Sequence, residues 1–328
     1  MGNMRLPRRQ FLHLGAGVAA LTSLLRAAHS QTYPTRPVHL IVGLAAGGGT
    51  DAVARIMAER LSEHLGQPFV VENRSGMAGN LATQFVVSAP PDGHTLSFAG
   101  AASTISSVLY KTLPFDFQRD FAPVGGVMRF PNLMVVPPSL PVRTVQEFID
   151  YARARPGQLS MASSGIGASP HLSGELFKFM TRIEMVHVPY RGSAAIYPDL
   201  MAGTVHVLFD NLAGSIALAR AGKLRALGVT SAQRWDALPD IPAIAETVPG
   251  YEVNVWYGIF APRNTPPDVI ATLNKAIAIA LTDPKVTARF AEVGGQPMPM
   301  SPAELAKYAA DDTEKWRKVV EFAGVKLE

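Results

Sequence analysis

The sequence predicts an α/β fold built from two domains. Two observations carry this prediction: a strand–helix–strand unit over residues 38–71, and a second strand, glycine-rich turn and helix start over residues 159–180. A strand that leads through a helix into another strand favours a parallel sheet covered by helices on both faces. With 328 residues, 48% of them hydrophobic, the chain is long enough to bury two cores.

The first unit is the clearest. Residues 38–42 form a short, continuously apolar run that is typical of a buried strand. After a loop of three consecutive glycines, apolar residues recur near every 3.6 positions from Val53 to Leu65, which predicts a helix that ends at Gly66 before Pro68. We expect Thr50 or Asp51 to cap this helix, and residues 69–71 to form the next strand.

The same alternation continues along the chain. We predict strands over residues 94–100, 133–136, 184–190, 205–210 and 223–230, and helices over residues 80–89 and 101–109, after Gly192, over residues 215–221 and through most of the tail from Pro266. Capping boxes, in which a hydroxyl residue precedes a glutamate by three positions, open helices at residues 144–147 and 301–304. Ser169 is expected to cap the helix after the second glycine-rich turn, with Pro170 at its first position.

Each half of the chain thus supplies one glycine-rich loop that leads into a helix N-terminus. Such an end carries free backbone N–H groups and the positive end of the helix dipole, so it attracts anions. Two loops that face each other across a cleft could hold a carboxylate without any arginine. The sequence therefore predicts an anion site made mainly of backbone.

Residues 1–30 read as a cleavable export signal. Arg8-Arg9 resembles a twin-arginine motif, an apolar stretch follows from Leu14 to Leu25, and a cut after Ser30 is expected. The alternative of a membrane anchor would need about 18 to 20 apolar residues. The cut leaves 26 basic and 26 acidic residues, and this balance argues against nucleic-acid binding.

Several kinds of chemistry are disfavoured. The chain has no cysteine, which excludes thiol nucleophiles and cysteine-held metals. The first loop lacks the phosphate-binding and dinucleotide-binding glycine spacings, no Gly-x-Ser-x-Gly elbow accompanies the serines near His171, and the histidines lack metal-ligand spacing. We therefore expect no catalytic residue, no cofactor and no metal.

Seven blocks occur in a specific order, among them "GLAAGGGTDAVAR", "SMASSGIGASPHLSGELF", "HVPYRGSAAIYPDLMAGTVHVLFDN" and "WYGIFAP". Together, from Tyr33 to the end, they resemble the extracytoplasmic substrate-binding proteins of tripartite tricarboxylate transporters, also called Bug receptors. The resemblance implies a periplasmic-binding-protein fold: two α/β domains with parallel-rich sheets flanked by helices, joined by crossing hinge strands. The domains would comprise residues 31–130 with 255–328, and residues 131–254.

The resemblance also implies a function. The chain would be a non-enzymatic periplasmic receptor that clamps a small organic carboxylate and delivers it to the membrane permease subunits of such a transporter. We expect it to be a monomer. A sensor that docks on a membrane kinase is the alternative. The ligand could be a tricarboxylate, a C4 dicarboxylate, an acidic amino acid or an aromatic acid.

The resemblance implies a ligand site, whose residues we assign by their positions in the matching blocks of this sequence. One carboxylate of the ligand would be held by both glycine-rich loops; the residues are Ala46, Gly47, Gly48, Gly49, Thr50 and Asp51 in the first, and Ser163, Ser164, Gly165, Gly167, Ser169 and the adjoining His171 in the second. The far end of the ligand is assigned to Tyr190, Asp210 and Asn211; the last two also follow a predicted strand, although they could simply form a turn. Gly43-Leu44 departs from the Pro-Phe pair of many relatives, which leaves the pocket volume open.

Overall fold

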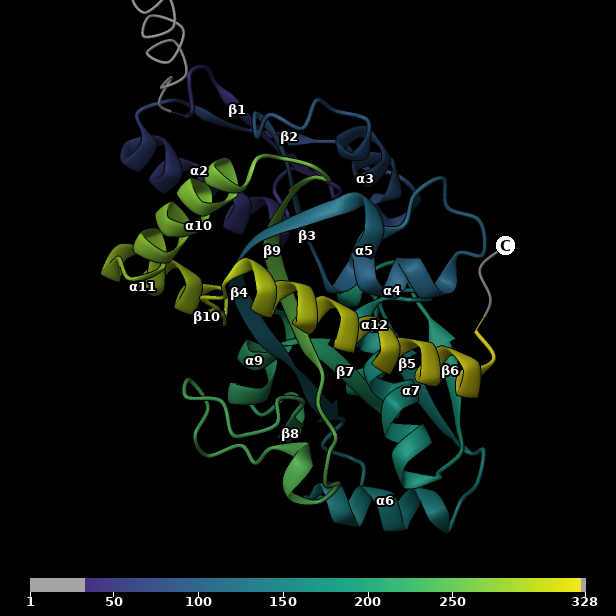
Figure 1. Cartoon of the computed structure of the whole chain (residues 1–328). Helices are drawn as coiled ribbons and strands as arrows, with labels where there is room; N and C mark the ends of the chain where they lie inside the picture. The colour runs from purple at the N-terminus through teal and green to yellow at the C-terminus, as the bar shows by residue number, and fades with distance from the viewer. Residues whose placement is uncertain (1–32, 326–328) are drawn as a thin grey trace, which may run out of the picture.

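The computed structural model describes residues 33–325. The predicted export signal and its cleavage site lie outside the described residues. The chain forms two lobes, drawn one above the other in Figure 1, which share a continuous path of hydrogen-bonded strands in the order β2-β1-β3-β9-β4-β7-β5-β6. The alternation of strands and helices predicted from the sequence is confirmed.

The first lobe contains the N-terminal sheet. Three of its strands are parallel, β1 (Val38–Val42), β2 (Phe69–Asn73) and β3 (Thr95–Gly100), and β9 (Asn254–Pro262) runs antiparallel to β3. Its helices are α2 (Gly49–Leu65), α3 (Asn80–Val87), α4 (Ala101–Leu109), α5 (Phe117–Asp120), α10 (Pro267–Leu281) and α11 (Pro284–Glu292). The apolar face predicted for α2 is buried, including Val53, Met57 and Leu61.

The second lobe repeats this plan. Its strands are β5 (Leu159–Ser163), β6 (Met185–Pro189), β7 (Val207–Asn211) and β8 (Arg225–Val229), with β5 parallel to both β6 and β7. Its helices are α6 (Val145–Arg153), α7 (Ser169–Thr181), α8 (Tyr197–Ala202) and α9 (Leu212–Arg220). Each of the two glycine-rich loops therefore joins a strand of its own lobe, β1 or β5, to the helix that follows.

One long strand connects the lobes. β4 (Phe121–Val136) pairs with β9 up to Pro131 and with β7 from Asn132 onward. The predicted strand 133–136 is only the end of β4. Pro123 and the glycines that follow hide its beginning, because they interrupt the apolar pattern, and the register of β4 against β9 shifts next to them.

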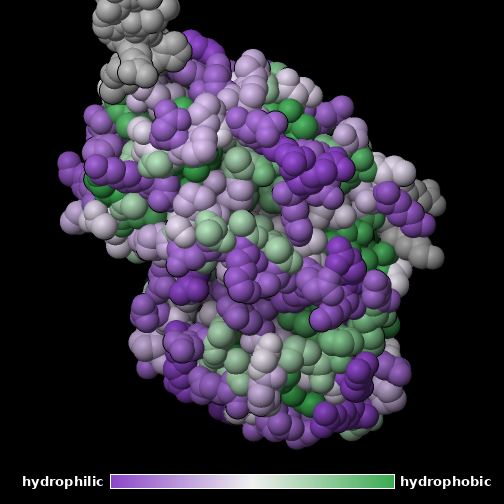
Figure 2. All heavy atoms as spheres, in the orientation of Figure 1, coloured by the Kyte–Doolittle hydropathy of each residue, from purple (hydrophilic) through white to green (hydrophobic). Residues whose placement is uncertain are grey.

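The C-terminal helix α12 (Pro302–Ala323) contributes to both lobes. Leu305 packs in a cluster with first-lobe side chains, whereas Trp316 and Val319 pack in a cluster with second-lobe side chains. Figure 1 shows α12 crossing the waist of the molecule, and a band of hydrophilic residues lies at the same place in Figure 2. The helix is thus amphipathic, with its apolar face against the two lobes.

The predicted helix caps are only partly correct. The capping box of Ser301 and Glu304 forms with both of its hydrogen bonds, and Thr144 caps α6. The prediction for Ser169 is wrong: the N-cap of α7 is Ala168, and the Ser169 hydroxyl instead donates to the side-chain oxygen of Asn211 at 3.2 Å. Neither Thr50 nor Asp51 is the N-cap of α2, which is Gly48.

Among residues 33–325, no helix combines the length and the apolar character needed to cross a membrane.

Candidate ligand-binding site

The strand directions turn the carboxyl ends of both sheets toward the junction between the lobes. β3 and β4 run the same way because each is antiparallel to β9, whereas β7 runs opposite to β4. Gly100, the last residue of β3, lies opposite Tyr257, which pairs with Met128 of β4. Asn211, the last residue of β7, lies opposite Asn132. Four residues of β4, about 13 Å of strand, separate these two positions, so the strand ends of both lobes point into the space between them, which is where ligands of open α/β sheets bind.

The first glycine-rich loop presents backbone to this space. Gly47, Gly48 and Gly49 are exposed, and the first intrahelical hydrogen bond of α2 runs from Ala52 N–H to Gly48 C=O. The N–H groups of Gly49, Thr50 and Asp51 therefore precede the helical ladder. They provide a set of donors at the positive end of a 17-residue helix.

Asp51 organises this loop from inside. Its buried carboxylate accepts a hydrogen bond from Gly47 N–H at 2.9 Å and another from Arg55 Nε at 2.9 Å. The hydrogen bond from Arg55 is the main reason that the pKa of Asp51 lies below its ordinary value. Asp51 thus fixes the positive φ of +81° at Gly47, while its charge is balanced by Arg55 rather than being directed at an anionic ligand.

A small cavity of about 40 Å³ adjoins the first loop at the ends of β1 and β3. Gly43, Leu44, Thr50, Ser103 and Tyr257 are among its lining residues, and Thr50 Oγ1 lies 2.9 Å from the Tyr257 hydroxyl. This volume accommodates only a few water-sized groups, so a larger ligand must extend into the space between the lobes. Ser103 and Tyr257 are not among the residues predicted from the sequence; the run of small residues after the strand that ends at Gly100 is the signal that could have indicated Ser103.

The second loop is hydrogen-bonded to the chain segment that follows β6. The φ values of Gly165 and Gly167 are +145° and +79°, which favour glycine. Ser163 O accepts from Tyr190 N–H at 2.9 Å, and Ser164 O accepts from Gly192 N–H at 3.2 Å. The side chain of Ser163 is fully buried, whereas Ser164 is half-buried. Of these two serines, only Ser164 has a surface that a ligand can reach.

The three residues assigned to the far end of the ligand lie around the same loop. Asn211 is exposed and accepts from Ser169, so it joins the N-termini of α7 and α9. Asp210 is fully buried, accepts from Ser193 Oγ and the Tyr197 hydroxyl, each at 2.7 Å, and has a pKa raised by burial. The Tyr190 hydroxyl donates to Asp199 at 2.7 Å.

Burial divides the predicted site residues into two groups. The exposed or half-buried ones, which a ligand can touch, are Ala46, Gly47, Gly48, Gly49, Thr50, Ser164, Gly165, Gly167, Ser169, Tyr190 and Asn211. The buried ones are Asp51, Ser163, His171 and Asp210. Every residue in this second group hydrogen-bonds to one of the loops or to a neighbouring segment, so it supports the surface instead of forming it.

Two histidines lie behind the second loop. The rings of His171 and His187 stack with centroids 3.8 Å apart. Burial lowers the pKa of His171 to about 3, with further contributions from His187 and Lys178. Burial, then Lys178, lowers the pKa of His187 to about 4. Both rings are therefore neutral near pH 7.

The lowered pKa values of these two histidines predict that the fold becomes less stable in acid. Between pH 6.5 and about 4 the unfolded histidines bind protons that the folded ones exclude, so the free energy of unfolding is fully retained above pH 6.5 and decreases as the pH falls through this window. Urea unfolding at pH 7.0 and pH 4.5 should give a lower midpoint at pH 4.5. His171→Phe should show a smaller decrease; an equal decrease in both proteins would contradict this explanation.

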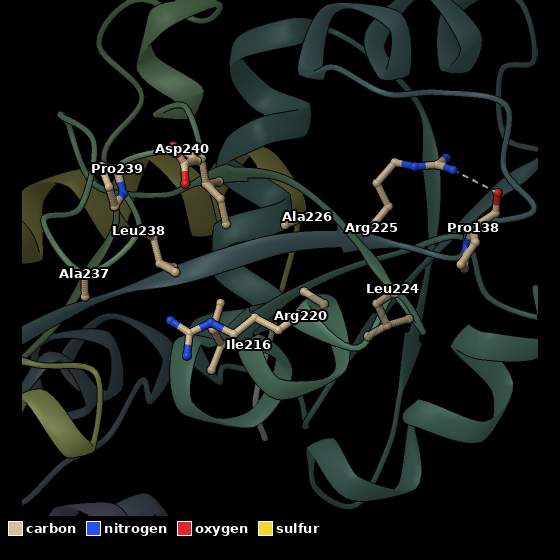
Figure 3. A pocket seen from close by; sticks show the side chains of 13 residues that line it. Pro138, Ile216, Arg220, Leu224, Arg225, Ala226, Ala237, Leu238, Pro239 and Asp240 are labelled. Atoms are coloured by element: carbon tan, nitrogen blue, oxygen red, sulfur yellow. Dashed lines mark hydrogen bonds between the residues drawn. The ribbon is translucent and has the colours of Figure 1, made fainter.

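A larger cavity of about 510 Å³ lies at the other end of the second lobe (Figure 3). Pro138 and Arg225 lie on its rim, beyond the end of β4 that pairs with the start of β7. The Arg225 guanidinium donates to the carbonyl oxygens of Pro138, Leu140 and Val142, so its role there is to fasten the chain between β4 and α6. None of the site residues predicted from the sequence lines this cavity, so the two loops remain the candidate site.

The geometry defines a class of protein: a two-lobed receptor whose strand ends and helix N-termini converge on the space between the lobes. Comparison with known proteins specifies the family. Residues 53–325 match the model of the tripartite tricarboxylate transporter family receptor, and the chain belongs to this family.

Curated relatives support the assignment over nearly the whole chain. A Pseudomonas sp. (strain P51) protein of the tcbD-tcbE intergenic region is 38% identical over 95% of this chain and 94% of its own length. BugT of Bordetella pertussis is 34% identical over 95% of each chain.

Solved structures agree in fold. An R. palustris protein solved with adipate is 42% identical, with a TM-score of 0.76 over 90% of this chain and 99% of the other. MatC from Rhodopseudomonas palustris, solved with bound malate, is 31% identical, with a TM-score of 0.73 over 88% of this chain and all of the other. The predicted periplasmic-binding-protein fold is confirmed, and the family consists of receptors, not enzymes.

Proposed function

We propose that this protein is a periplasmic receptor that captures a small dicarboxylate between its lobes and delivers it to the membrane subunits of a tripartite tricarboxylate-type transporter. The observation that carries the proposal is the strand direction: β1 and β5, which lead into the loops at residues 46–51 and 163–169 and then into α2 and α7, both end toward the junction between the lobes. Backbone donors at two helix ends suit a carboxylate and require no buried basic side chain.

The proposed ligand class is supported by the similar proteins that were solved with adipate and with malate. Both are flexible dicarboxylates. The exposed Leu44 and Ile166, one on each loop, would flank the methylene segment between the two carboxylates. We therefore place linear dicarboxylates ahead of tricarboxylates, acidic amino acids and aromatic acids.

The export signal, the monomeric state and the two domains predicted from the sequence belong to the same proposed function. The export signal over residues 1–30 would direct the chain to the periplasm, where it would act as a monomer. Residues 31–130 with 255–328, and residues 131–254, would be the two domains of the clamp, although α12 packs on both. A ligand that binds both domains stabilises a closed state that the free protein already samples.

A thermal-shift screen tests the ligand class. The purified protein is refolded to remove any carried-over ligand and then heated with C4 to C8 dicarboxylates, citrate, glutamate, benzoate and uncharged diols. A ligand at a hundredfold its Kd adds about 2.7 kcal/mol of stability, which gives a clear upward shift. We expect this shift with at least one dicarboxylate and none with the diols. A shift only with uncharged compounds would contradict the proposal.

A further inference from the structure

The second glycine-rich loop rests on a buried histidine, His171, and a half-buried one, His187, which the proposed ligand contacts do not use. His171 comes from the first turn of α7 and His187 from β6, and their rings stack at an interplanar angle of 17°. The His171 side chain is 3% exposed. This ring has almost no surface for a ligand, although His171 is among the ligand-site residues predicted from the sequence.

The hydrogen bonds of His171 fix its tautomer. Gly167 N–H donates to His171 Nδ1 at 3.1 Å, so Nδ1 must carry a lone pair and the ring proton must be on Nε2. That nitrogen lies 3.8 Å from Glu175 Oε1. A proton on Nδ1 would remove the acceptor of the Gly167 amide.

The second ring contacts the loop through the side chain of Ser163. Ser163 Oγ receives Gly165 N–H at 3.3 Å and donates its single proton to Gly165 O at 3.1 Å. The same hydroxyl lies 2.7 Å from His187 Nε2, so it is held between this ring and Gly165. His187 thus orients the Ser163 hydroxyl, which holds Gly165 on both its N–H and its C=O.

We propose that His171 and His187 are positioning residues that hold Gly165 and Gly167 in the conformation that presents the N-terminus of α7 to the ligand, and that His171 does so only as a neutral ring. The inference rests on the proposed function, because it assumes that this loop binds the carboxylate. Both glycines have backbone conformations that favour glycine, and each is fastened by one of the two rings.

The charges around the pair favour the neutral rings. On α7, Lys178 Nζ lies 2.9 Å from both oxygens of the buried Glu175, so this carboxylate is already balanced. On β5 the neighbouring group is the Ser163 hydroxyl, and on β6 it is the other ring. A proton on either histidine would therefore face a stacked ring and a lysine, with no unpaired carboxylate among the groups described here.

Three variants test the inference at pH 7, where carboxylate ligands stay ionised. His171→Phe keeps the stacked ring and removes the acceptor of the Gly167 amide; the Kd for the best dicarboxylate should rise at least tenfold. His171→Gln supplies an amide oxygen as acceptor and should restore most of the affinity. His206→Phe is the matched control, because His206 Nδ1 also accepts a backbone N–H, from Ser160 at 3.1 Å, but at the start of β5. It should leave the Kd within twofold.

Nuclear magnetic resonance of the wild-type rings gives a second test that does not depend on the variants' folding. His171 should show the Nε2–H tautomer at pH 7, and neither ring should titrate above pH 5. Titration of His171 near pH 6.5, or an unchanged Kd in His171→Phe, would overturn the inference.

The failure of the proposed function would be distinguishable. If the wild type bound no carboxylate, the proposed function would be wrong. Hydrogen exchange of the Gly167 amide would then test the role of the histidines. Faster hydrogen exchange at Gly167 in His171→Phe than in His171→Gln would support it, and equal exchange would overturn it.

Discussion

Gly48→Leu is expected to abolish carboxylate binding while the protein stays folded. Gly48 is the N-cap of α2, with φ −80° and ψ 170°, a conformation open to any residue. A Cβ there would meet only Ala45 O, at 3.5 Å, so the leucine side chain would project in front of the free N–H groups. We expect the Kd to rise at least about 100-fold, or ~2.7 kcal/mol, by isothermal titration calorimetry with the dicarboxylate found in the screen.

Gly222→Ala is the control for this experiment. Gly222 follows α9 at the far end of the second lobe and has φ +69°, so alanine introduces backbone strain of about 1–2 kcal/mol without approaching the loops. Its Kd should match that of the wild type. Wild-type affinity in Gly48→Leu would show that the ligand does not contact this end of α2.

Asp312→Ala is expected to cause the largest loss of stability. Asp312 is 5% exposed on α12, and its carboxylate accepts from Trp256 Nε1 at 3.0 Å and from Thr104 Oγ1 at 2.7 Å. Lys315 Nζ lies 2.8 Å from its other oxygen. The substitution leaves the buried indole N–H without its acceptor and detaches α12 from β9 and α4, so we expect about 3 kcal/mol of destabilisation in urea unfolding.

The neighbouring residue provides the matched control. Asp311 forms an exposed ion pair with Lys307, and its side chain is 65% exposed. Asp311→Ala should change the free energy of unfolding by less than about 0.5 kcal/mol. Equal effects of the two substitutions would mean that the buried contacts of Asp312 do not hold α12 in place.

The sequence predicted most of the elements because their patterns are local. The apolar run of β1 and the spacing from Val53 to Leu65 need no distant partner to be recognised. The full length of β4 could not be predicted in this way. Its first half contains Pro123 and two glycines. This half forms a strand because it pairs with β9.

The candidate site shows the same limit. Glycine-rich loops at the ends of strands are visible in the sequence, and the predicted anion site is based on them. Which side chains face inward is a tertiary property: His171 and Asp210 are buried because β6 and the segment around Tyr197 cover them. Ser169 was misassigned as a cap because its partner, Asn211, lies 42 residues away.

We expect backbone N–H groups of the two loops, rather than basic side chains, to hold the carboxylate. A crystal structure of the complex with the best dicarboxylate from the screen tests this claim most directly. We expect one carboxylate within hydrogen-bond distance of N–H groups from residues 47–51 and 164–169, with Leu44 and Ile166 beside the methylene segment. A carboxylate bound instead to the exposed Arg191, or lodged in the cavity beside Arg225, would contradict the claim.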